Sequence, residues 1–159
     1  MGAERERSRG APRIGLADDV ELVRTLFREY EAGLGVSLCF QGFDEEVAAL
    51  PAGYDALLVA WLGDEAAGCI GVRGLGDGIC EMKRLYVRES ARGAGIGRTL
   101  AVASIEHARA LGYERMRLDN LPLHMAAAYE LYQSLGFVEI EPYNDNPLPG
   151  VKFMELRLI

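Results

Sequence analysis

The chain has 159 residues, half of them hydrophobic, and a formal net charge of −7. This length is typical of one domain, and no apolar run reaches the roughly 18 residues that predict a transmembrane helix. The acidic balance disfavours nucleic acid as a partner, because nucleic-acid binding requires a basic face.

The cysteines predict neither disulfides nor a metal site. Cys39, Cys69 and Cys80 are odd in number and form no Cys-x-x-Cys motif, and His107 and His124 fit no zinc spacing. We therefore expect three free thiols, no metal, and a cytoplasmic protein, because thiols stay reduced in that compartment.

The N-terminal residues differ in composition from the rest. Residues 1–12 are charged, small and polar, and are expected to form a disordered tail. Residues 13–159 carry the periodic apolar patterns and are expected to form a single domain.

In chain order, the apolar patterns predict a strand, two helices, three strands, a helix, a strand, a helix and two strands. Strands are expected at residues 13–16, 56–62, 67–75, 79–87, 113–118, 137–140 and 151–158. Helices are expected after Asp18 or Asp19, from Asp44, over residues 96–111 and over residues 125–135. This order predicts an antiparallel meander followed by a β-α-β crossover, and hence an α+β (α/β) fold with a mixed sheet.

A glycine-rich segment, Arg-Gly-Ala-Gly-Ile-Gly-Arg-Thr at residues 92–99, lies between a predicted strand and a predicted helix. Glycines let a ligand approach the backbone, and a helix start supplies free N–H groups, so the segment predicts a phosphate site. A dinucleotide fingerprint would need glycine at Arg98 or Leu100, and a Walker loop would need Lys after Gly97. A plain strand-to-helix turn is the alternative.

Three features together resemble the GNAT superfamily of N-acetyltransferases. Arg-x-x-Gly-x-Gly from Arg92 resembles its pyrophosphate loop. Leu-Tyr-x-x-x-Gly-Phe at residues 131–137 resembles its second signature, and Glu81 stands where many members carry a carboxylate base. The resemblance covers at least residues 81–140. It implies a GNAT-like, mostly antiparallel sheet of about seven strands with about four helices.

The resemblance implies roles for two side chains. Glu81 would be the general base, directly or through water, and Tyr132 the general acid that protonates the departing thiolate. The alternatives are an ion pair between Glu81 and Lys83 or Arg84, and simple core packing for Tyr132. Strand alternation places Glu81 on one face with Lys83, Leu85 and Val87, and the opposite face is expected to carry Met82, Arg84 and Tyr86.

The resemblance also implies the acetyl-CoA contacts. Leu85, Tyr86 and Val87 would contact the pantetheine arm, and the Val87 N–H would polarise the thioester carbonyl. Those to the pyrophosphate would come from Arg92, Gly93, Ala94, Gly95, Ile96, Gly97, Arg98 and Thr99. In one respect the sequence departs from the family: Met125 stands where an Asn often contacts the cofactor, and Asn120 and His124 are the candidates to replace it.

We therefore predict an acetyl-CoA-dependent N-acetyltransferase that moves the acetyl group to a primary amine by direct attack and releases CoA. The acceptor is expected to be a small-molecule amine or amino acid. A protein or peptide amino group, and a catalytically silent acyl-CoA-binding regulatory module, remain alternatives. No nucleic-acid or membrane partner is expected, and a homodimer stays open. The resemblance also implies candidates for acceptor selection, on segments that border the acceptor cleft in related enzymes, with plain surface-loop positions as the alternative: Tyr30, Phe40, Phe43, Tyr143, Asn144 and Asn146.

Overall fold

The computed structural model describes residues 11–35, 37–38, 42–121 and 126–159. The predicted disordered tail therefore falls, apart from its last two residues, outside the described part of the chain. Within that part, no helix is long and apolar enough to cross a membrane.

The fold is built on one mixed sheet whose strand order is β1-β2-β3-β4-β5-β7-β6. The strands are β1 (Arg13–Leu16), β2 (Ala56–Leu62), β3 (Glu65–Gly76), β4 (Ile79–Val87), β5 (Arg115–Asn120), β6 (Val138–Ile140) and β7 (Lys152–Arg157). Only β4 and β5 pair in parallel, and the other neighbours are antiparallel. The predicted mixed, mostly antiparallel sheet is confirmed, and β7 inserts between β5 and β6.

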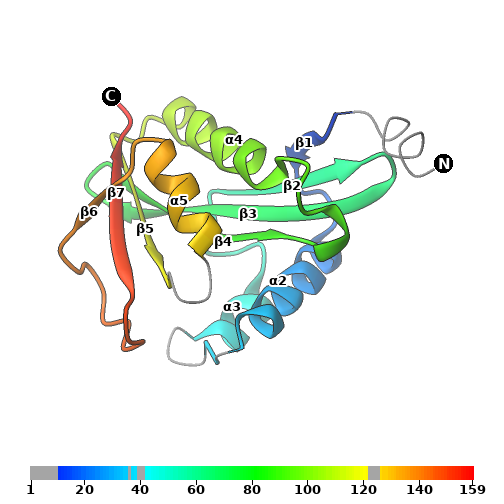
Figure 1. Ribbon diagram of the computed structural model, residues 1–159, viewed down its shortest axis with the longest axis horizontal. Helices are drawn as coiled ribbons and strands as arrows, with labels where there is room; N and C mark the ends of the chain where they lie inside the picture. The colour runs from blue at the N-terminus through cyan, green and yellow to red at the C-terminus, as the bar shows by residue number, and fades with distance from the viewer. Residues whose placement is uncertain (1–10, 36, 39–41, 122–125) are drawn as a thin grey trace.

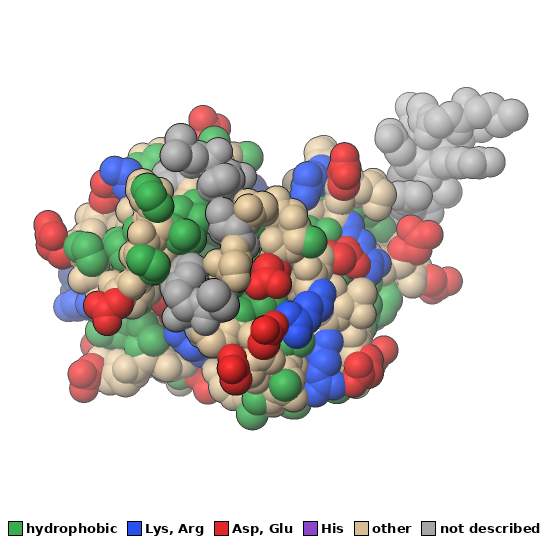
Figure 2. Space-filling view, turned by 90° about the horizontal axis from the view of Figure 1, so that it is seen from below, with side chains coloured by type: hydrophobic (Ala, Val, Ile, Leu, Met, Phe, Trp, Pro, Cys, Tyr) green, Lys and Arg blue, Asp and Glu red, His purple; other side chains and the backbone are tan. Residues whose placement is uncertain are grey.

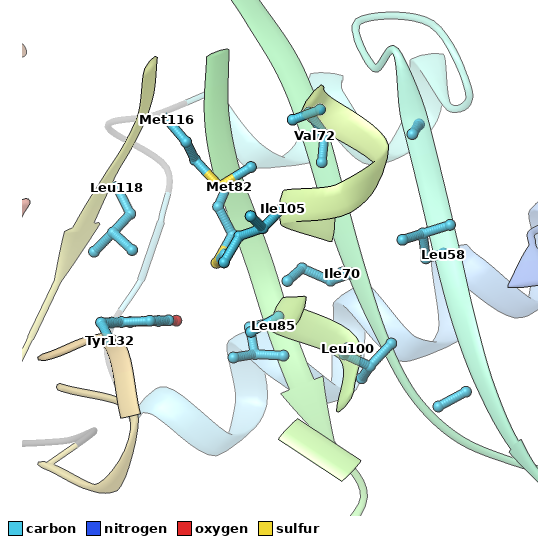
Figure 3. Packing of buried hydrophobic residues seen from close by; sticks show 14 of the residues in the cluster. Leu58, Ile70, Val72, Met82, Leu85, Leu100, Ile105, Met116, Leu118 and Tyr132 are labelled. Atoms are coloured by element: carbon cyan, nitrogen blue, oxygen red, sulfur yellow. The ribbon is translucent and has the colours of Figure 1, made fainter. Parts of the chain in front are cut away.

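Helices cover both faces of the sheet (Figure 1). They are α2 (Val20–Leu34), α3 (Phe43–Ala49), α4 (Ile96–Ala110) and α5 (Ala126–Ser134), with a short 3-10 turn at Glu89–Ala91. Buried residues of α4 and Tyr132 of α5 share one core cluster, and those of α2 and α3 share the other. The sheet therefore separates two hydrophobic layers; Figure 3 shows the layer on the α4 side.

The observed starts of α2 and α3 can be compared with the N-terminal caps predicted for these helices. The Asp19 carboxylate accepts hydrogen bonds from the backbone N–H groups of Glu21 and Leu22, which identifies Asp19 rather than Asp18 as the cap of α2. The predicted Asp44 cap of α3 is wrong. That helix begins one residue earlier, at Phe43, after Gly42 in the left-handed conformation. Phe43 is fully buried, so packing fixes this start rather than a side-chain cap.

β4 and β5 pair over only three residues, Ile79–Glu81 against Arg115–Arg117. Both strands continue beyond this point, and in Figure 1 they diverge. The divergence opens a gap in the middle of the sheet, bordered by the second half of β4 and the end of β5.

A bulge in β4 changes which side chains face the gap. Tyr86 pairs with Cys69 and Lys83 with Gly71, so β4 has one residue more than β3 between these pairs. Arg84 supplies the extra residue and has a positive φ of 60°. The predicted alternation is therefore wrong after Lys83: Leu85 packs in the α4 layer together with Met82, not on the face of Glu81.

Arg84 is held in this conformation by α3. Its Nε and Nη2 atoms donate to the Glu46 carboxylate at 3.0 and 2.9 Å, and the guanidinium stacks 4.9 Å from the Phe43 ring centroid. Only 4% of Arg84 is exposed. Because the pair is buried, removing one partner leaves an uncompensated charge in the interior.

We predict that Arg84→Met lowers the free energy of unfolding by about 3–5 kcal/mol, because Glu46 loses its partner in a buried site. Arg28→Met is the matched control. Arg28 also stacks on Phe43, at 5.5 Å, but its ion pair with Asp44 is exposed to solvent, where such pairs contribute about 0–1 kcal/mol. Figure 2 shows acidic and basic side chains close together on the face seen from below. Urea denaturation of the two variants measures both changes. Equal losses would show that the buried pair has no special role.

Candidate functional site

The glycine segment forms an open cradle at the start of α4. Gly93 and Gly95 have φ values of 89° and 73°, and Gly95 is the N-cap residue, with no side-chain hydrogen bond to the helix start. A Cβ at either glycine would meet no atom within 4 Å. The free N–H groups of the first turn therefore face open space, as an anion site requires.

The other predicted loop residues divide into backbone and side-chain contributors. Ile96 is buried in the core, so only its backbone can reach a ligand. The Thr99 hydroxyl donates to the Gly95 carbonyl, and Arg98 donates to Ser134 of α5 at 3.0 Å. Arg92 is exposed and donates from Nε to the Val87 carbonyl at 3.2 Å, beside the cradle.

A groove of about 400 Å³ joins this cradle to the end of β4. Its lining includes five of the predicted contact positions, namely residues 85–87 of β4, Arg92 and Gly97. The opposite wall of the groove was not predicted from the sequence; it is made by residues 126–128 at the start of α5 and by the end of α2. Three successive alanines were the available signal, because small side chains leave room beside a helix.

The second signature positions Tyr132 through a helix cap. Gly136 has a φ of 101°, its N–H donates to the Gln133 carbonyl, and the Phe137 N–H donates to the Tyr132 carbonyl. This is a Schellman motif, and the accompanying apolar contact is the pair of Tyr132 and Phe137 rings, 5.7 Å apart. Figure 3 shows the Tyr132 hydroxyl directed across the gap toward β4. Burial raises the pKa of Tyr132, so the phenol stays protonated.

Glu81 lies at the point where β4 and β5 separate, and it is only 1% exposed. Its Oε1 accepts from Arg73 Nε at 2.8 Å and lies 3.7 Å from Lys83 Nζ; its Oε2 accepts from the Tyr143 hydroxyl at 2.6 Å. The predicted neighbour Lys83 is present, but Arg84 pairs with Glu46 instead. Arg73 was not anticipated, and Tyr143 contacts Glu81 rather than only bordering the cleft.

Two small hollows lie in the gap beside Tyr132. The inner hollow, of about 20 Å³, is lined by Lys83, Leu85, Asn120 and Tyr132 among others. The outer hollow, of about 30 Å³, also contains Asn120 and extends to the loop before β7. The inner hollow shares Leu85 with the groove and Asn120 with the outer hollow, so the three spaces are neighbours in the gap.

The structure places the residues predicted to select the acceptor in different surroundings. Tyr30 lines the groove and both hollows. Asn144 and Asn146 donate to the Asp119 carboxylate at 3.0 and 3.3 Å, which ties their loop to the end of β5. Phe43 is a core residue, and its prediction as a cleft residue is wrong. Phe40, His124 and Met125 lie outside the described residues.

The described cysteines are core residues, as predicted. Cys69 and Cys80 are free and buried, and burial raises the pKa of both thiols, to about 12 for Cys80. Neither is a thiolate at neutral pH, so neither provides a nucleophile. Cys39 lies outside the described residues.

Known proteins resemble this chain in sequence and in fold. An uncharacterised N-acetyltransferase of Schizosaccharomyces pombe is 39% identical, with 91% of this chain and 92% of the relative covered. A GNAT-family acetyltransferase from Staphylococcus aureus superposes with a TM-score of 0.77 at 17% identity, covering 94% of this chain and all of that one. A Salmonella typhimurium protein described as a putative acetyltransferase, solved with acetyl-CoA, gives a TM-score of 0.69 at 22% identity, covering 94% and 95%.

The model of the acetyltransferase (GNAT) family matches residues 21–137, which include β4, the glycine cradle and the Tyr132 cap. The match covers more than half of the chain and agrees with the S. pombe relative. The chain therefore belongs to the GNAT family and is an N-acetyltransferase, with acetyl-CoA as the acyl donor.

Proposed function

We propose that this N-acetyltransferase moves the acetyl group of acetyl-CoA to the primary amine of a small molecule or amino acid, by direct attack. The observation that carries the proposal is the row of neighbouring spaces along the gap, in which the inner hollow shares Leu85 with the groove and Asn120 with the outer hollow. The groove begins at the glycine cradle, and the hollows end at buried polar groups on the acceptor side. Such a row of spaces lets donor and acceptor enter from opposite sides and meet near Leu85 and Tyr132.

The cradle and groove suit the donor. The N–H groups around Gly95 and the charge of Arg92 would hold the pyrophosphate, and the open space at Gly93 and Gly95 is where a Cβ would intrude. Beyond Glu81, β4 no longer pairs with β5, so its edge is available to the pantetheine amides over residues 85–87. The Val87 N–H would then polarise the thioester carbonyl.

Tyr132 and Glu81 would supply the proton transfers. Tyr132 has a fixed ring, a protonated phenol and a place in the inner hollow, which suit an acid that protonates the leaving thiolate. Both carboxylate oxygens of Glu81 already accept hydrogen bonds, so it would take the amine proton through an intervening water. The inner hollow has room for about one water molecule.

The small size of the hollows favours a compact acceptor over a peptide segment. A regulatory module without activity is also less well supported, because the chain retains both Glu81 and Tyr132 beside the gap.

We predict that Gly95→Val abolishes CoA binding in a folded protein. The branched side chain would fill the space of a phosphate oxygen and strain a backbone whose φ is 73°. Gly63→Val is the matched control, because Gly63 has a φ of 60° and equally open surroundings in the β2–β3 turn. Calorimetric titration with CoA measures both. If the Gly95 variant kept wild-type affinity, the loop would be only a turn.

Tyr132→Phe should lower turnover roughly 10²-fold with little change in CoA affinity, if acid catalysis is direct. The substitution keeps the ring that packs on Phe137 and removes only the hydroxyl. CoA release is followed with an identified amine acceptor, and CoA affinity is measured separately. Wild-type turnover in the variant would make Tyr132 a packing residue.

Glu81→Gln should lower turnover most at neutral pH. Raising the pH should partly restore it, because more of the acceptor amine then loses its proton without help. The pH profile of kcat/KM for variant and wild type measures the effect. A parallel loss at every pH would assign Glu81 to structure, through Arg73 and Tyr143, and would move the base elsewhere.

A further inference from the structure

Asn120 carries a buried donor that has no hydrogen-bond partner among the described residues. It is the last residue of β5, only 5% of it is exposed, and it lines both hollows. Within the described part of the chain, its Nδ2 atom makes no hydrogen bond. Leaving such a donor unsatisfied is costly, so a buried amide aimed into a cavity indicates a ligand atom that accepts a hydrogen bond.

Lys83 brings a positive charge to the inner hollow. It is 8% exposed, and its ion pair with Glu81 is 3.7 Å long, beyond hydrogen-bond length. Burial and the neighbouring Arg84 lower the pKa of Lys83, and Arg73 acts in the same direction, while Glu81 and Asp119 oppose them. An anion bound beside Nζ would offset this destabilisation of the ammonium.

The carboxylates around the hollows are already engaged. Glu46 accepts from Arg84, Glu81 accepts from Arg73 and Tyr143, and Asp119 accepts from two asparagines of the loop before β7. In the described part of the chain, neither Asn120 Nδ2 nor Lys83 Nζ makes a hydrogen bond, whereas these acceptors are used. The hollows therefore match a ligand group that has acceptor oxygens, and Lys83 is the lining cation without a hydrogen-bonded carboxylate, so it can balance a negative charge on that group.

The volume of the two hollows limits the size of the ligand group that they can hold. The hollows measure about 20 and 30 Å³ and share Asn120, so together they admit one or two water-sized groups but no ring. A carboxylate presents two oxygens of this size. Because Tyr132 and Leu85 line the same inner hollow, a group bound there lies beside the reacting end of the groove.

We infer that Asn120 and Lys83 bind a carboxylate of the acceptor, so that the substrate is an amino acid rather than a simple amine. This inference rests on the proposed function, because it assigns the acceptor of the same reaction. The two side chains act in substrate recognition, and the acetyl transfer itself needs neither of them.

The first test compares each of the twenty common L-amino acids with its α-carboxamide, following release of the CoA thiol from acetyl-CoA. We expect at least one acid to exceed its amide by about 10-fold or more in kcat/KM, the value of a hydrogen bond to a charged group. The preference would oppose intrinsic reactivity, because the α-amino group of an amide is less basic and more often unprotonated. Equal use of acids and amides would overturn the inference.

The second test uses Asn120→Leu and Lys83→Met, which keep approximate side-chain size. For the preferred acid, each should raise KM by about 10- to 100-fold, whereas the KM of the amide should stay unchanged; kcat is compared separately for Lys83→Met, because that variant also removes the ion pair with Glu81. Gln133→Leu and Lys152→Met, at exposed positions of α5 and β7, are the matched controls. Equal losses for acid and amide would assign both residues to structure and overturn the inference.

A binding measurement separates this inference from the proposed function. Calorimetric titration of the CoA-loaded protein with the N-acetyl derivatives of the same amino acids should detect binding that Asn120→Leu weakens. Turnover of amines with no preference for the acid would overturn the inference and leave the function intact. Release of no CoA with any amine, together with no binding of the N-acetyl acids, would overturn both.

Discussion

Arg84 and Glu46 form a buried ion pair at the point where β4 departs from regular alternation. A non-glycine residue at positive φ costs about 1–3 kcal/mol and persists only where its surroundings impose it. Two hydrogen bonds from Arg84 to Glu46 and the stacking of its guanidinium on the Phe43 ring impose this conformation. Helix α3 therefore fixes the shape of strand β4 through the Arg84 side chain. The geometry of the gap depends on this contact.

The bulge has two consequences for the site. It turns Leu85 to the α4 layer, where it forms the junction of groove and inner hollow. It also places two consecutive cations, Lys83 and Arg84, on the same face of the strand, which regular alternation would forbid. Arg84 is neutralised by Glu46, and Lys83 is left facing the inner hollow with one long ion pair. The same distortion that shapes the donor groove therefore concentrates positive charge on the acceptor side.

The shapes of the glycine cradle and of the helix end at Tyr132 could be predicted from sequence because their determinants are local. The cradle needs glycines within one turn, and the position of Tyr132 follows from a helix cap whose residues lie within six positions of one another. Strand and helix order also followed from local periodicity. The acceptor side could not be predicted in the same way, because Tyr143 reaches Glu81 across 62 positions and Glu46 reaches Arg84 across 38. The bulge was missed for the same reason, since the partner that stabilises it lies in another helix.

The environment of Glu81 limits how a proton can leave the reacting amine. Tyr143 donates to one of its oxygens, and burial raises the pKa of that phenol, so Tyr143 keeps its proton near neutrality. Lys83 lies 3.7 Å from the other oxygen, and burial and Arg84 lower its pKa. Glu81 therefore has a hydrogen-bond donor on each oxygen, Arg73 on one and Tyr143 on the other. In the proposed reaction, the amine proton would reach Glu81 through a water molecule rather than by displacing either donor.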